Sequence, residues 1–435
     1  MKRKIPASIE FIGDHRDRII LNMKNLQPED SGEIVEFFRE NQDLTYFRVS
    51  ELNPEILNQI LDHLEKKAFS LKRVTKWHLF DINNMDAGLF GRLVSLMPNV
   101  ESFIAFNCLL TPDHGKEISQ LKSLEEIEIF GHPSGSGIGD TGADAIGQLE
   151  NLKSLVLPNS GVGSQGAAFL SNLRQLGHLN ISENRIEDEG LMAIAKNLKN
   201  LGYLDVRSAN LGPESAQMIE AYLKKLLFLR ISDNHLGNEG ARIIGKMTKL
   251  SNLEIAKNDL GHEGVQGLCK LKNLVFLDIR DNRIGKEGAK LIAENFKKLV
   301  SLLIGNNDIG DEGITEISEK LKGLYYLDAS SNNVGDKGAE SIGRLKEMVH
   351  LRLQKNKIGD EGIKIIAQNL KKLYQLNLFD NAIRDAGARE IIDNLKELRV
   401  VVLDWNKISK STMEKFEHLF PNISPEGLSV TRYRE

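Results

Sequence analysis

The residue types that perform chemistry in enzymes and metal sites are scattered along this sequence. The two cysteines, Cys108 and Cys269, are far apart, and neither belongs to a CxxC or Cys/His pattern with metal-ligand spacing. The ten histidines are equally dispersed, and no Ser/His/Asp set, HExxH motif or phosphate-binding loop stands out. We therefore expect no catalytic residues, no metal site, no cofactor and no enzymatic activity.

The net charge and the hydropathy of the sequence indicate which binding partners and which cellular location to expect. A net charge of -4, from 57 basic and 61 acidic side chains, creates no field that attracts a polyanion, so we expect no nucleic-acid partner. No apolar stretch of signal-peptide length follows the basic start Met1–Pro6, and no run approaches the length of a membrane span. We expect no membrane insertion, and either a reducing cytoplasmic location or export into a host cell without a cleavable N-terminal signal.

A repeat with the pattern LxxLxLxxNxIGxxGAxxIAxxL must position any surface that this protein uses. Its copies are 24 or 25 residues apart after a first step of 28, which contains an insertion within Gly131–Gly137. Weaker copies begin at Leu44, Val74 and Val100, which brings the predicted strands to fifteen. The regular copies begin at Leu124, Leu152, Leu176, Leu201, Leu226, Leu250, Leu274, Leu299, Leu324, Met348, Leu373 and Leu398.

Each copy predicts a short strand, a turn, a helix and a return loop. In LxxLxL the alternating apolar residues point inward and the intervening residues face outward, as the alternation along a strand requires. Copies over residues 44–408 are expected to stack into a solenoid with parallel strands. Residues 1–43, with a capping strand near Ile19–Met23 and an amphipathic helix around Glu33–Phe38, and residues 409–435 are expected to cap its ends.

Asparagine, glycine and acidic residues recur at fixed places of the repeat. The asparagine, such as Asn332, can satisfy backbone groups in a buried turn, where an unpaired group would cost about 1–3 kcal/mol. Cys108 falls in the same column and is expected to be buried. A first glycine column, which includes Gly310, suits a turn with unusual backbone angles, and a second, which includes Gly313, lets helices pack closely. Acidic pairs such as Asp360–Glu361 are expected to interact with the helix dipole.

The period and the pattern are those of leucine-rich repeats. Segments such as Ile309–Gly313 and Ile358–Ile363 resemble the ribonuclease-inhibitor-like subclass, above all its bacterial members, including GALA-type effectors. The resemblance covers about residues 44–408 and implies an α/β fold, a right-handed solenoid or horseshoe with a parallel β-sheet on the concave face and helices on the convex face. It also implies recognition of a protein partner on the concave face. The chain has almost no cysteine, and its repeats are shorter than those of the ribonuclease inhibitor. The resemblance therefore does not imply ribonuclease binding.

Outward-facing strand positions hold two groups of residues of the types found at interface hot spots. We expect them to bind a partner and the unbound chain to be a monomer. One group is an aromatic row formed by Phe80, Phe106 and Phe130. The other is central and contains Tyr203, Phe228, Phe276 and Tyr326 beside Arg207, Arg230, Arg280 and Arg352.

Other interpretations of these positions stay open. The aromatic residues could merely stack along the sheet, and Asp205, Arg230, Glu254 and Asp278 could form cross-strand charge ladders of about 0.2–1 kcal/mol each. Trp405 forms a smaller cluster with Phe379 and either binds the partner or packs on the cap. The insertion near His132 is a second contact or simply a tolerated loop.

An alternative function rests on the segment Leu52–Leu64, followed by Val74 and Trp77. It is similar to an F-box, the helical motif that docks substrate adaptors onto a ubiquitin ligase, and F-boxes precede the repeats of GALA-type proteins. However, Leu44 already begins a repeat strand upstream, Pro54 suits the first turn of that repeat's helix, and the later spacing departs from the F-box pattern. The first interpretation is therefore a protein-binding module, and an adaptor using residues 52–77 is the alternative.

Overall fold

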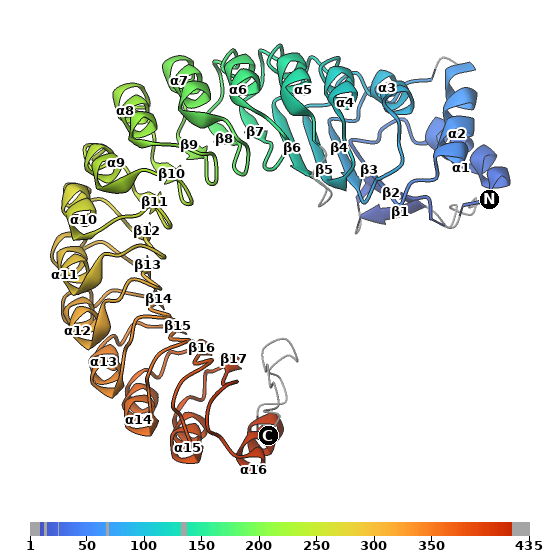
Figure 1. Ribbon diagram of the computed structural model, residues 1–435. Coiled ribbons are helices and arrows are strands. Elements are labelled where there is room, and N and C mark those ends of the chain that lie inside the picture. The colour runs from blue at the N-terminus through green and yellow to red at the C-terminus, as the bar shows by residue number, and fades with distance from the viewer. Residues whose placement is uncertain (1–8, 13–14, 25, 67–68, 132–136, 420–435) are drawn as a thin grey trace. The chain divides into compact units, whose positions relative to one another are not determined.

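The computed structural model describes residues 9–12, 15–24, 26–66, 69–131 and 137–419 (Figure 1). These residues form two compact units. Unit 1 consists of Met1–Leu211 and Ala221–Leu226, and unit 2 of Gly212–Glu220 and Leu227–Glu435. Helix α8 (Pro213–Tyr222) contains residues of both units.

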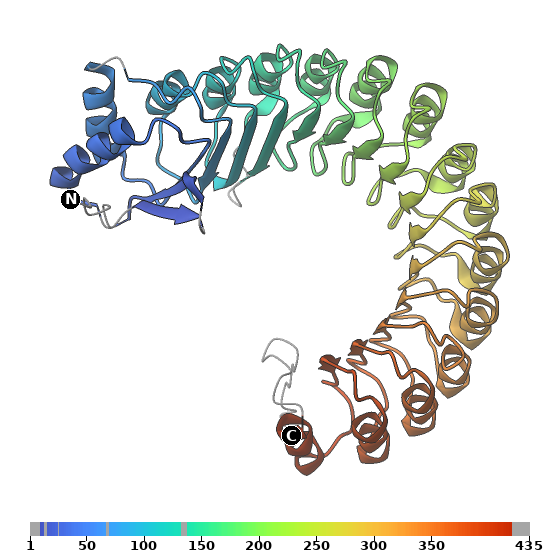
Figure 2. The ribbon, with the colours of Figure 1, turned by 180° about the vertical axis from the view of Figure 1, so that it is seen from behind.

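Unit 1 consists of one layer of strands and one layer of helices (Figures 1 and 2). Strands β2 to β9 are each parallel to the next, and β1 joins β2 in antiparallel orientation. The strands are β1 (Ile9–Ile12), β2 (His15–Asn22), β3 (Tyr46–Ser50), β4 (Lys76–Phe80), β5 (Ser102–Cys108), β6 (Glu126–Gly131), β7 (Ser154–Val156), β8 (His178–Asn180) and β9 (Tyr203–Asp205). The helices are η1 (Pro28–Asp30), α1 (Ser31–Glu40), α2 (Pro54–Lys66), α3 (Ala87–Leu96), α4 (Pro112–Ile118), α5 (Gly139–Ile146), α6 (Ser164–Leu170) and α7 (Glu187–Asn197).

Unit 2 has the same two layers, with the strands on the inner side of a curve and the helices on the outer side (Figure 1). Its eight strands are parallel throughout. They are β10 (Phe228–Arg230), β11 (Asn252–Glu254), β12 (Phe276–Asp278), β13 (Ser301–Leu303), β14 (Tyr326–Asp328), β15 (His350–Arg352), β16 (Gln375–Asn377) and β17 (Val400–Val402). The helices are α9 (Gly237–Ile244), α10 (His262–Leu268), α11 (Gly285–Asn295), α12 (Gly310–Lys320), α13 (Asp336–Ile342), α14 (Asp360–Asn369), α15 (Asp385–Asn394) and α16 (Lys410–Leu419).

The core lies between the two layers of each unit. The inward positions of the strand motif, for example Leu299, Leu302 and Ile304, are almost completely buried. Helix positions such as Ile314 and Ile317 close the layer from the other side. The predicted α/β leucine-rich-repeat solenoid, with a parallel sheet in one layer and helices in the other, is confirmed in each unit. Strands β3 to β17 lie at the fifteen predicted repeat positions.

The N-terminal end is more regular than the sequence indicates. The strand expected near residues 19–23 is β2, which begins earlier, at His15, and pairs with the unpredicted strand β1. The expected amphipathic helix is α1, whose apolar side chains Ile34, Val35 and Phe38 are buried. The proposed bounds of the two caps remain predictions, because residues 1–8 and 420–435 lie outside the described residues.

The F-box-like segment forms an ordinary repeat helix. It lies on α2, which connects the parallel strands β3 and β4. The apolar side chains of this helix, including Ile56, Leu57, Ile60 and Leu61, are buried at 0–2% exposure. Trp77 is buried in β4 against Phe90 and Phe103. The apolar face of this segment is therefore part of the core.

The asparagine side chains satisfy backbone groups in buried turns, as predicted, and their hydrogen bonds run from repeat to repeat. Asn332 donates from Nδ2 to the carbonyl oxygen of Ile304 at 2.9 Å, and its Oδ1 accepts from the backbone N–H of Asn307 at 3.0 Å. Both partners belong to the preceding repeat, so the asparagine side chain connects two neighbouring turns by hydrogen bonds. Cys108 in the same column is buried, as expected, and its thiol lies 3.3 Å from the carbonyl oxygen of Phe106.

The expectation for the first glycine column is only half right. Gly310 has φ +59, but Gly335 at the same place has φ -105, which is ordinary extended backbone. The difference lies in the preceding repeat, where Asp311 accepts a hydrogen bond from the N–H of Gly335 at 2.7 Å. Before Gly310 the corresponding residue is Lys286, which offers no acceptor, and the N–H of Gly310 bonds instead to the carbonyl oxygen of Asn332.

Candidate protein-binding surfaces

The predicted aromatic row of unit 1 is a contiguous surface. Phe80, Phe106 and Phe130 are in register on β4, β5 and β6. The ring centroid of Phe106 is 6.0 Å from that of Phe80 and 5.9 Å from that of Phe130. Phe106 is 50% exposed, and the two flanking rings are half-buried. Parallel pairing of equivalent repeat positions therefore places three phenyl rings side by side with the most exposed one in the middle.

Polar groups border this row on the side of β3. The guanidinium carbon of Arg48 lies 3.9 Å from the ring centroid of Phe80. The hydroxyl of Tyr46 lies 2.8 Å from Nδ1 of His78. Burial, together with the positive charges of Arg48 and Lys76, lowers the pKa of His78 to about 4, and burial raises the pKa of Tyr46. The Tyr46–His78 pair is therefore uncharged at neutral pH, and Arg48 supplies the positive charge at this edge.

The predicted central group does not form one continuous row. Tyr203 belongs to unit 1, where its ring stacks on His178 with a centroid distance of 4.1 Å. In unit 2, Phe228 and Phe276 are separated by the strand that carries Asn252 at the same position. Ser301 separates Phe276 from Tyr326 in the same way. The aromatic side chains of this group in unit 2 thus occupy every second strand, with small polar residues between them.

Three of the four predicted arginines have carboxylate partners within the chain. Arg207 bonds to Asp205 two residues earlier, with Nη2 and Oδ2 2.9 Å apart. Arg230 pairs with Glu254 of the neighbouring strand at 2.8 Å. Of these two pairs, only Arg230–Glu254 joins neighbouring strands, as the predicted cross-strand charge ladder requires.

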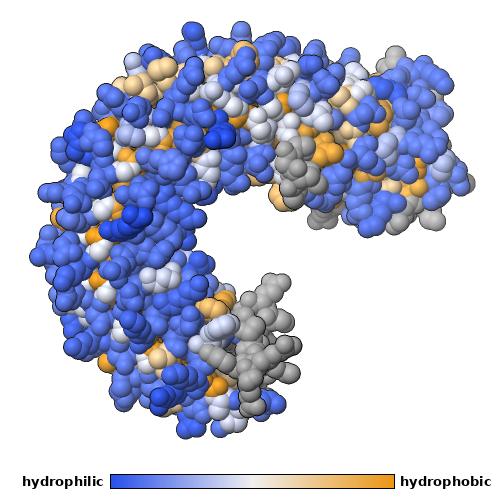
Figure 3. Space-filling view, in the orientation of Figure 1, coloured by the Kyte–Doolittle hydropathy of each residue, from blue (hydrophilic) through white to orange (hydrophobic). Residues whose placement is uncertain are grey.

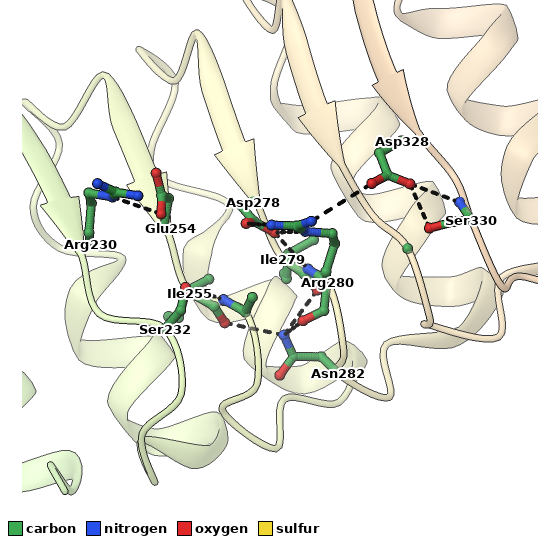
Figure 4. A network of polar contacts seen from close by, with 12 residues as sticks. Arg230, Ser232, Glu254, Ile255, Asp278, Ile279, Arg280, Asn282, Asp328 and Ser330 are labelled. Atoms are coloured by element: carbon green, nitrogen blue, oxygen red, sulfur yellow. Dashed lines mark hydrogen bonds and ion pairs between the residues drawn. The ribbon is translucent and has the colours of Figure 1, made fainter. Parts of the chain in front are cut away.

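The third arginine is the centre of a larger network (Figure 4). Arg280 lies 2.7 Å from Asp278 on its own strand and 3.8 Å from Asp328 two strands away. Asp328 also accepts a hydrogen bond from the hydroxyl of Ser330 at 2.6 Å. The carboxylates are 3% and 2% exposed, and hydrogen bonding to Asp278 raises the pKa of Arg280 despite its partial burial. Asp278 and Asp328 are therefore buried counterions of Arg280, although both lie at outward-facing positions of the sheet.

Arg352 differs from these three arginines. Its guanidinium carbon lies 5.6 Å from the ring centroid of Tyr326, and no carboxylate of the described residues lies within 4.0 Å of its nitrogens. The ring of His350 contacts three tyrosines, with centroid distances of 5.4 Å to Tyr325, 5.9 Å to Tyr326 and 6.1 Å to Tyr374. These side chains come from the consecutive strands β14, β15 and β16 and from the residues just before them.

Tyr325 and Tyr374 belong to an exposed row that the sequence interpretation missed. They occupy the second position of the repeat, just before the strand. Backbone hydrogen bonds connect this position from repeat to repeat, for example from Tyr374 N–H to Val349 and from Val349 N–H to Tyr325. The apolar residues of this row that are 41–48% exposed are Leu227, Val275, Val300, Tyr325 and Tyr374. Large apolar residues recurring just before the strand were the signal that could have identified it.

The smaller C-terminal cluster is exposed. The ring centroids of Trp405 and Phe379 are 6.0 Å apart, and Trp405 is 52% exposed. Its φ of +60 is an uncommon backbone conformation for a large side chain. This residue is therefore half accessible next to the ring of Phe379. The insertion near His132 lies outside the described residues.

Groups that could do chemistry are few in the described part of the chain. Burial raises the pKa of the Cys108 thiol to about 11 and also raises that of Cys269, which disfavours a reactive thiolate. Buried His114 hydrogen bonds through Nε2 to the carbonyl oxygen of Met85, which is a structural contact. Within the described ranges, no group of three or more His, Cys, Asp or Glu side chains could hold a metal ion. No described helix has the length and apolar composition needed to span a membrane.

The surface outside the sheet is mostly polar. Figure 3 shows predominantly hydrophilic residues on the side in view, with apolar residues in small, separated groups. Salt bridges between neighbouring helices, such as Lys286–Glu312 and Arg344–Glu319, contribute to this polar surface. The aromatic rows on the sheet, in contrast, place apolar rings on an exposed face.

Comparisons with known proteins agree with this architecture. A family model described as Leucine Rich repeat matches residues 174–195, 222–244, 270–293, 297–318, 324–343, 348–367 and 369–391. Comparison with the curated proteins gives no significant sequence match.

Two solved structures of bacterial proteins are similar in fold. An internalin (InlF) from Listeria monocytogenes has a TM-score of 0.51 at 20% identity, over 73% of this chain and 83% of that chain. The leucine-rich-repeat protein LIC12759 from Leptospira interrogans has a TM-score of 0.53 at 23% identity, over 94% of this chain and 99% of that chain. At these identities the similarity concerns the fold alone. The chain is thus built from leucine-rich repeats and has the leucine-rich-repeat solenoid fold.

Proposed function

We propose that this chain is a non-catalytic module that binds a protein partner on the exposed face of its sheet, with the Phe80–Phe106–Phe130 row of unit 1 as a principal contact. The half-exposed ring of Phe106, between two other phenyl rings, carries this proposal. Covering the exposed half of such a ring, roughly 100 Å², is worth about 2–3 kcal/mol. A partner that covers the row gains this free energy without reorganising the sheet.

The polar border of the row supports recognition of a protein. Arg48, stacked on Phe80, offers donors next to an apolar surface, and this combination of aromatic and arginine residues is enriched at interface hot spots. The net charge of -4 supports a protein rather than a nucleic acid as the partner. Tyr203, Phe228, Phe276, Tyr326 and Trp405 remain candidate contacts of the same kind.

The biological setting is also part of the proposal. The resemblance of segments such as Ile358–Ile363 to ribonuclease-inhibitor-like and GALA-type bacterial repeats supports a bacterial effector that acts on a host protein. This part rests on sequence resemblance alone. It implies that the partner is present in host-cell lysate rather than in the lysate of the organism that makes the chain.

The adaptor alternative is not favoured. An F-box must present apolar side chains to its ligase subunit, whereas Ile56, Leu57 and Ile60 of α2 are buried in the core. Exposing them would require this helix to detach from the core. We therefore do not propose ligase docking through residues 52–77.

The test is affinity capture followed by titration. Wild type, Phe106→Ser and Met192→Ser are immobilised and exposed to host-cell and own-cell lysates. Met192 is the control because it is an exposed apolar residue on helix α7, in the other layer of the same unit. A protein that is captured by wild type and Met192→Ser is then purified and titrated against all three.

We expect Phe106→Ser to raise the dissociation constant about 30-fold, as the loss of roughly 2 kcal/mol implies, and Met192→Ser to leave it unchanged. Circular dichroism establishes that the variants are folded. Equal affinity of wild type and Phe106→Ser would show that the partner does not use this row.

A further inference from the structure

Arg352 differs from the other three arginines of the central group. Arg207, Arg230 and Arg280 are each held by a carboxylate of the chain itself, at 2.7–2.9 Å. Arg352 is half-buried on β15, and the described residues place no carboxylate within 4.0 Å of it. A half-buried guanidinium gains more from a carboxylate than an exposed one, because the surrounding protein screens the attraction less than water does.

The nearest candidate within the sheet is already engaged. Asp328 is the register partner of Arg352 on β14. Its Oδ1 accepts hydrogen bonds from the hydroxyl and the backbone N–H of Ser330, at 2.6 and 3.1 Å, and its Oδ2 lies 3.8 Å from Arg280. The carboxylate is thus directed toward Arg280 and away from Arg352. The next residue in register on β16 is Asn377, which carries no charge.

One tyrosine ring, that of Tyr326, contacts the guanidinium of Arg352, and His350 connects this ring to two further tyrosines. Tyr326 lies under the guanidinium at 5.6 Å, and His350 packs between Tyr326 and Tyr374. Tyr325 and Tyr374 are 45% and 48% exposed. Nδ1 of His350 lies 3.3 Å from Oε1 of Gln375, which fixes the ring within the row. His350 thus connects the ring under the guanidinium to two exposed tyrosine rings.

We propose that this cluster in unit 2 binds an acidic segment of a partner protein, with an aspartate or glutamate carboxylate on Arg352 and a neighbouring apolar side chain on Tyr325 and Tyr374. The planar guanidinium can donate two parallel hydrogen bonds to a carboxylate while it remains stacked on Tyr326. The proposal rests on the protein-binding function above but concerns a different unit and different residues.

Charge complementarity favours a carboxylate over a phosphate. In the described part of the chain, the site has one guanidinium without a counterion, and this matches a single negative charge. A phosphate dianion would leave a second negative charge near Asp328, which is 2% exposed and poorly screened by solvent. The partner in this site is therefore an acidic segment rather than a phosphorylated one.

The test uses a displayed library of random peptides selected on the full chain. The site predicts that selected peptides carry Asp or Glu next to an apolar residue. A representative peptide is then titrated with wild type, Arg352→Gln, Arg352→Lys and the control Arg283→Gln. Arg283 is 85% exposed and lies in the same unit. We expect Arg352→Gln to weaken binding at least about tenfold, Arg352→Lys to weaken it less, and Arg283→Gln to have no effect.

A double-mutant cycle between Arg352→Gln and an acid-to-amide change in the peptide tests direct contact. We expect the second change to have little further effect once the first is present. Additive effects, peptides without an acidic residue, failure to select any peptide, or tighter binding of a phosphorylated peptide would each overturn the proposal. Because the peptides replace the natural partner, the outcome is independent of whether Phe106→Ser abolishes capture.

Discussion

Asp360 accepts a hydrogen bond from the backbone N–H of Arg384 in the next repeat, at 2.7 Å. The same oxygen accepts a second from the N–H of Gly387, at 2.9 Å, so that one carboxylate fastens the start of the following helix. Arg384 has φ -115 under this arrangement. In an earlier repeat, Glu187 occupies the place of Arg384, and Ser164 occupies the place of Asp360. Ser164 has no carboxylate to accept these hydrogen bonds, and Glu187 has φ +58. A side chain in one repeat thus selects the backbone conformation of the next.

Replacement of Glu187 and of Arg384 by glycine should therefore have opposite effects. Glu187→Gly relieves a left-handed conformation that costs roughly 1–2 kcal/mol and should stabilise the chain by about 0.5 kcal/mol after the entropy of glycine is counted. Arg384→Gly relieves nothing and should destabilise it by about 0.5–1 kcal/mol. Urea midpoints of the two variants, measured side by side, check this prediction. Equal losses in both would refute the rule.

The acidic residues at the place of Asp360 also explain why glycine recurs in the second glycine column, which includes Gly362. A Cβ on Gly362 would lie 2.5 Å from Oδ1 of Asp336 and 2.8 Å from Cβ of Ala339, both in the preceding repeat. We expect Gly362→Ala to destabilise the chain by about 1–3 kcal/mol through overpacking. Gly323→Ala is the control, because no atom lies within 4 Å of a Cβ there, and its unfolding midpoint should change little. A midpoint of Gly362→Ala equal to that of the control would contradict this prediction.

The network of Arg280 should contribute to stability rather than to binding alone. Arg280→Ala leaves the carboxylates of Asp278 and Asp328, 3% and 2% exposed, without their counterion. We expect a loss of about 3 kcal/mol in the free energy of unfolding. Arg283→Ala removes an exposed pair with Asp259 and should cost less than about 1 kcal/mol. If chemical denaturation gives equal losses for both, the network around Arg280 does not stabilise the fold.

His78 should make the stability of the chain depend on pH in a defined window. Its pKa falls from 6.5 to about 4 in the folded protein, chiefly because of burial. Between pH 6.5 and about 4, the unfolded chain binds a proton that the folded chain does not, so stability decreases as the pH falls through this range. His78→Gln should flatten this part of the curve of urea midpoint against pH. Direct titration of the ring by NMR checks the pKa, and a value near 6.5 would contradict the prediction.

The repeat, the two layers and the alternation of inward and outward side chains can be predicted from the amino-acid pattern alone. Each of these depends on which residue types recur, and a recurring pattern forces neighbouring copies to stack in the same way. For the same reason the register of Phe80, Phe106 and Phe130, the burial of Cys108 and the hydrogen bonding of Asn332 to backbone groups could be predicted. The glycine column and the central aromatic group were only partly predicted.

Tertiary structure decided the contacts between the less regular side chains. Arg280 reaches Asp328 across the repeat that contains β13 and Gly305, and a Cβ on Gly305 would meet the hydroxyl of Ser330 at 2.5 Å. Among the described residues, Arg352 has no such carboxylate partner, and Asp328 lies 3.8 Å from Arg280 instead. Likewise, the exposure of Tyr374 depends on how the residues just before strand β16 pack. These contacts join residues of different repeats, which lie 24, 25 or more positions apart in the sequence. The backbones of these repeats are nearly identical. Their outcome depends on which side chains the neighbouring copies present, and only the stacked structure brings those side chains together.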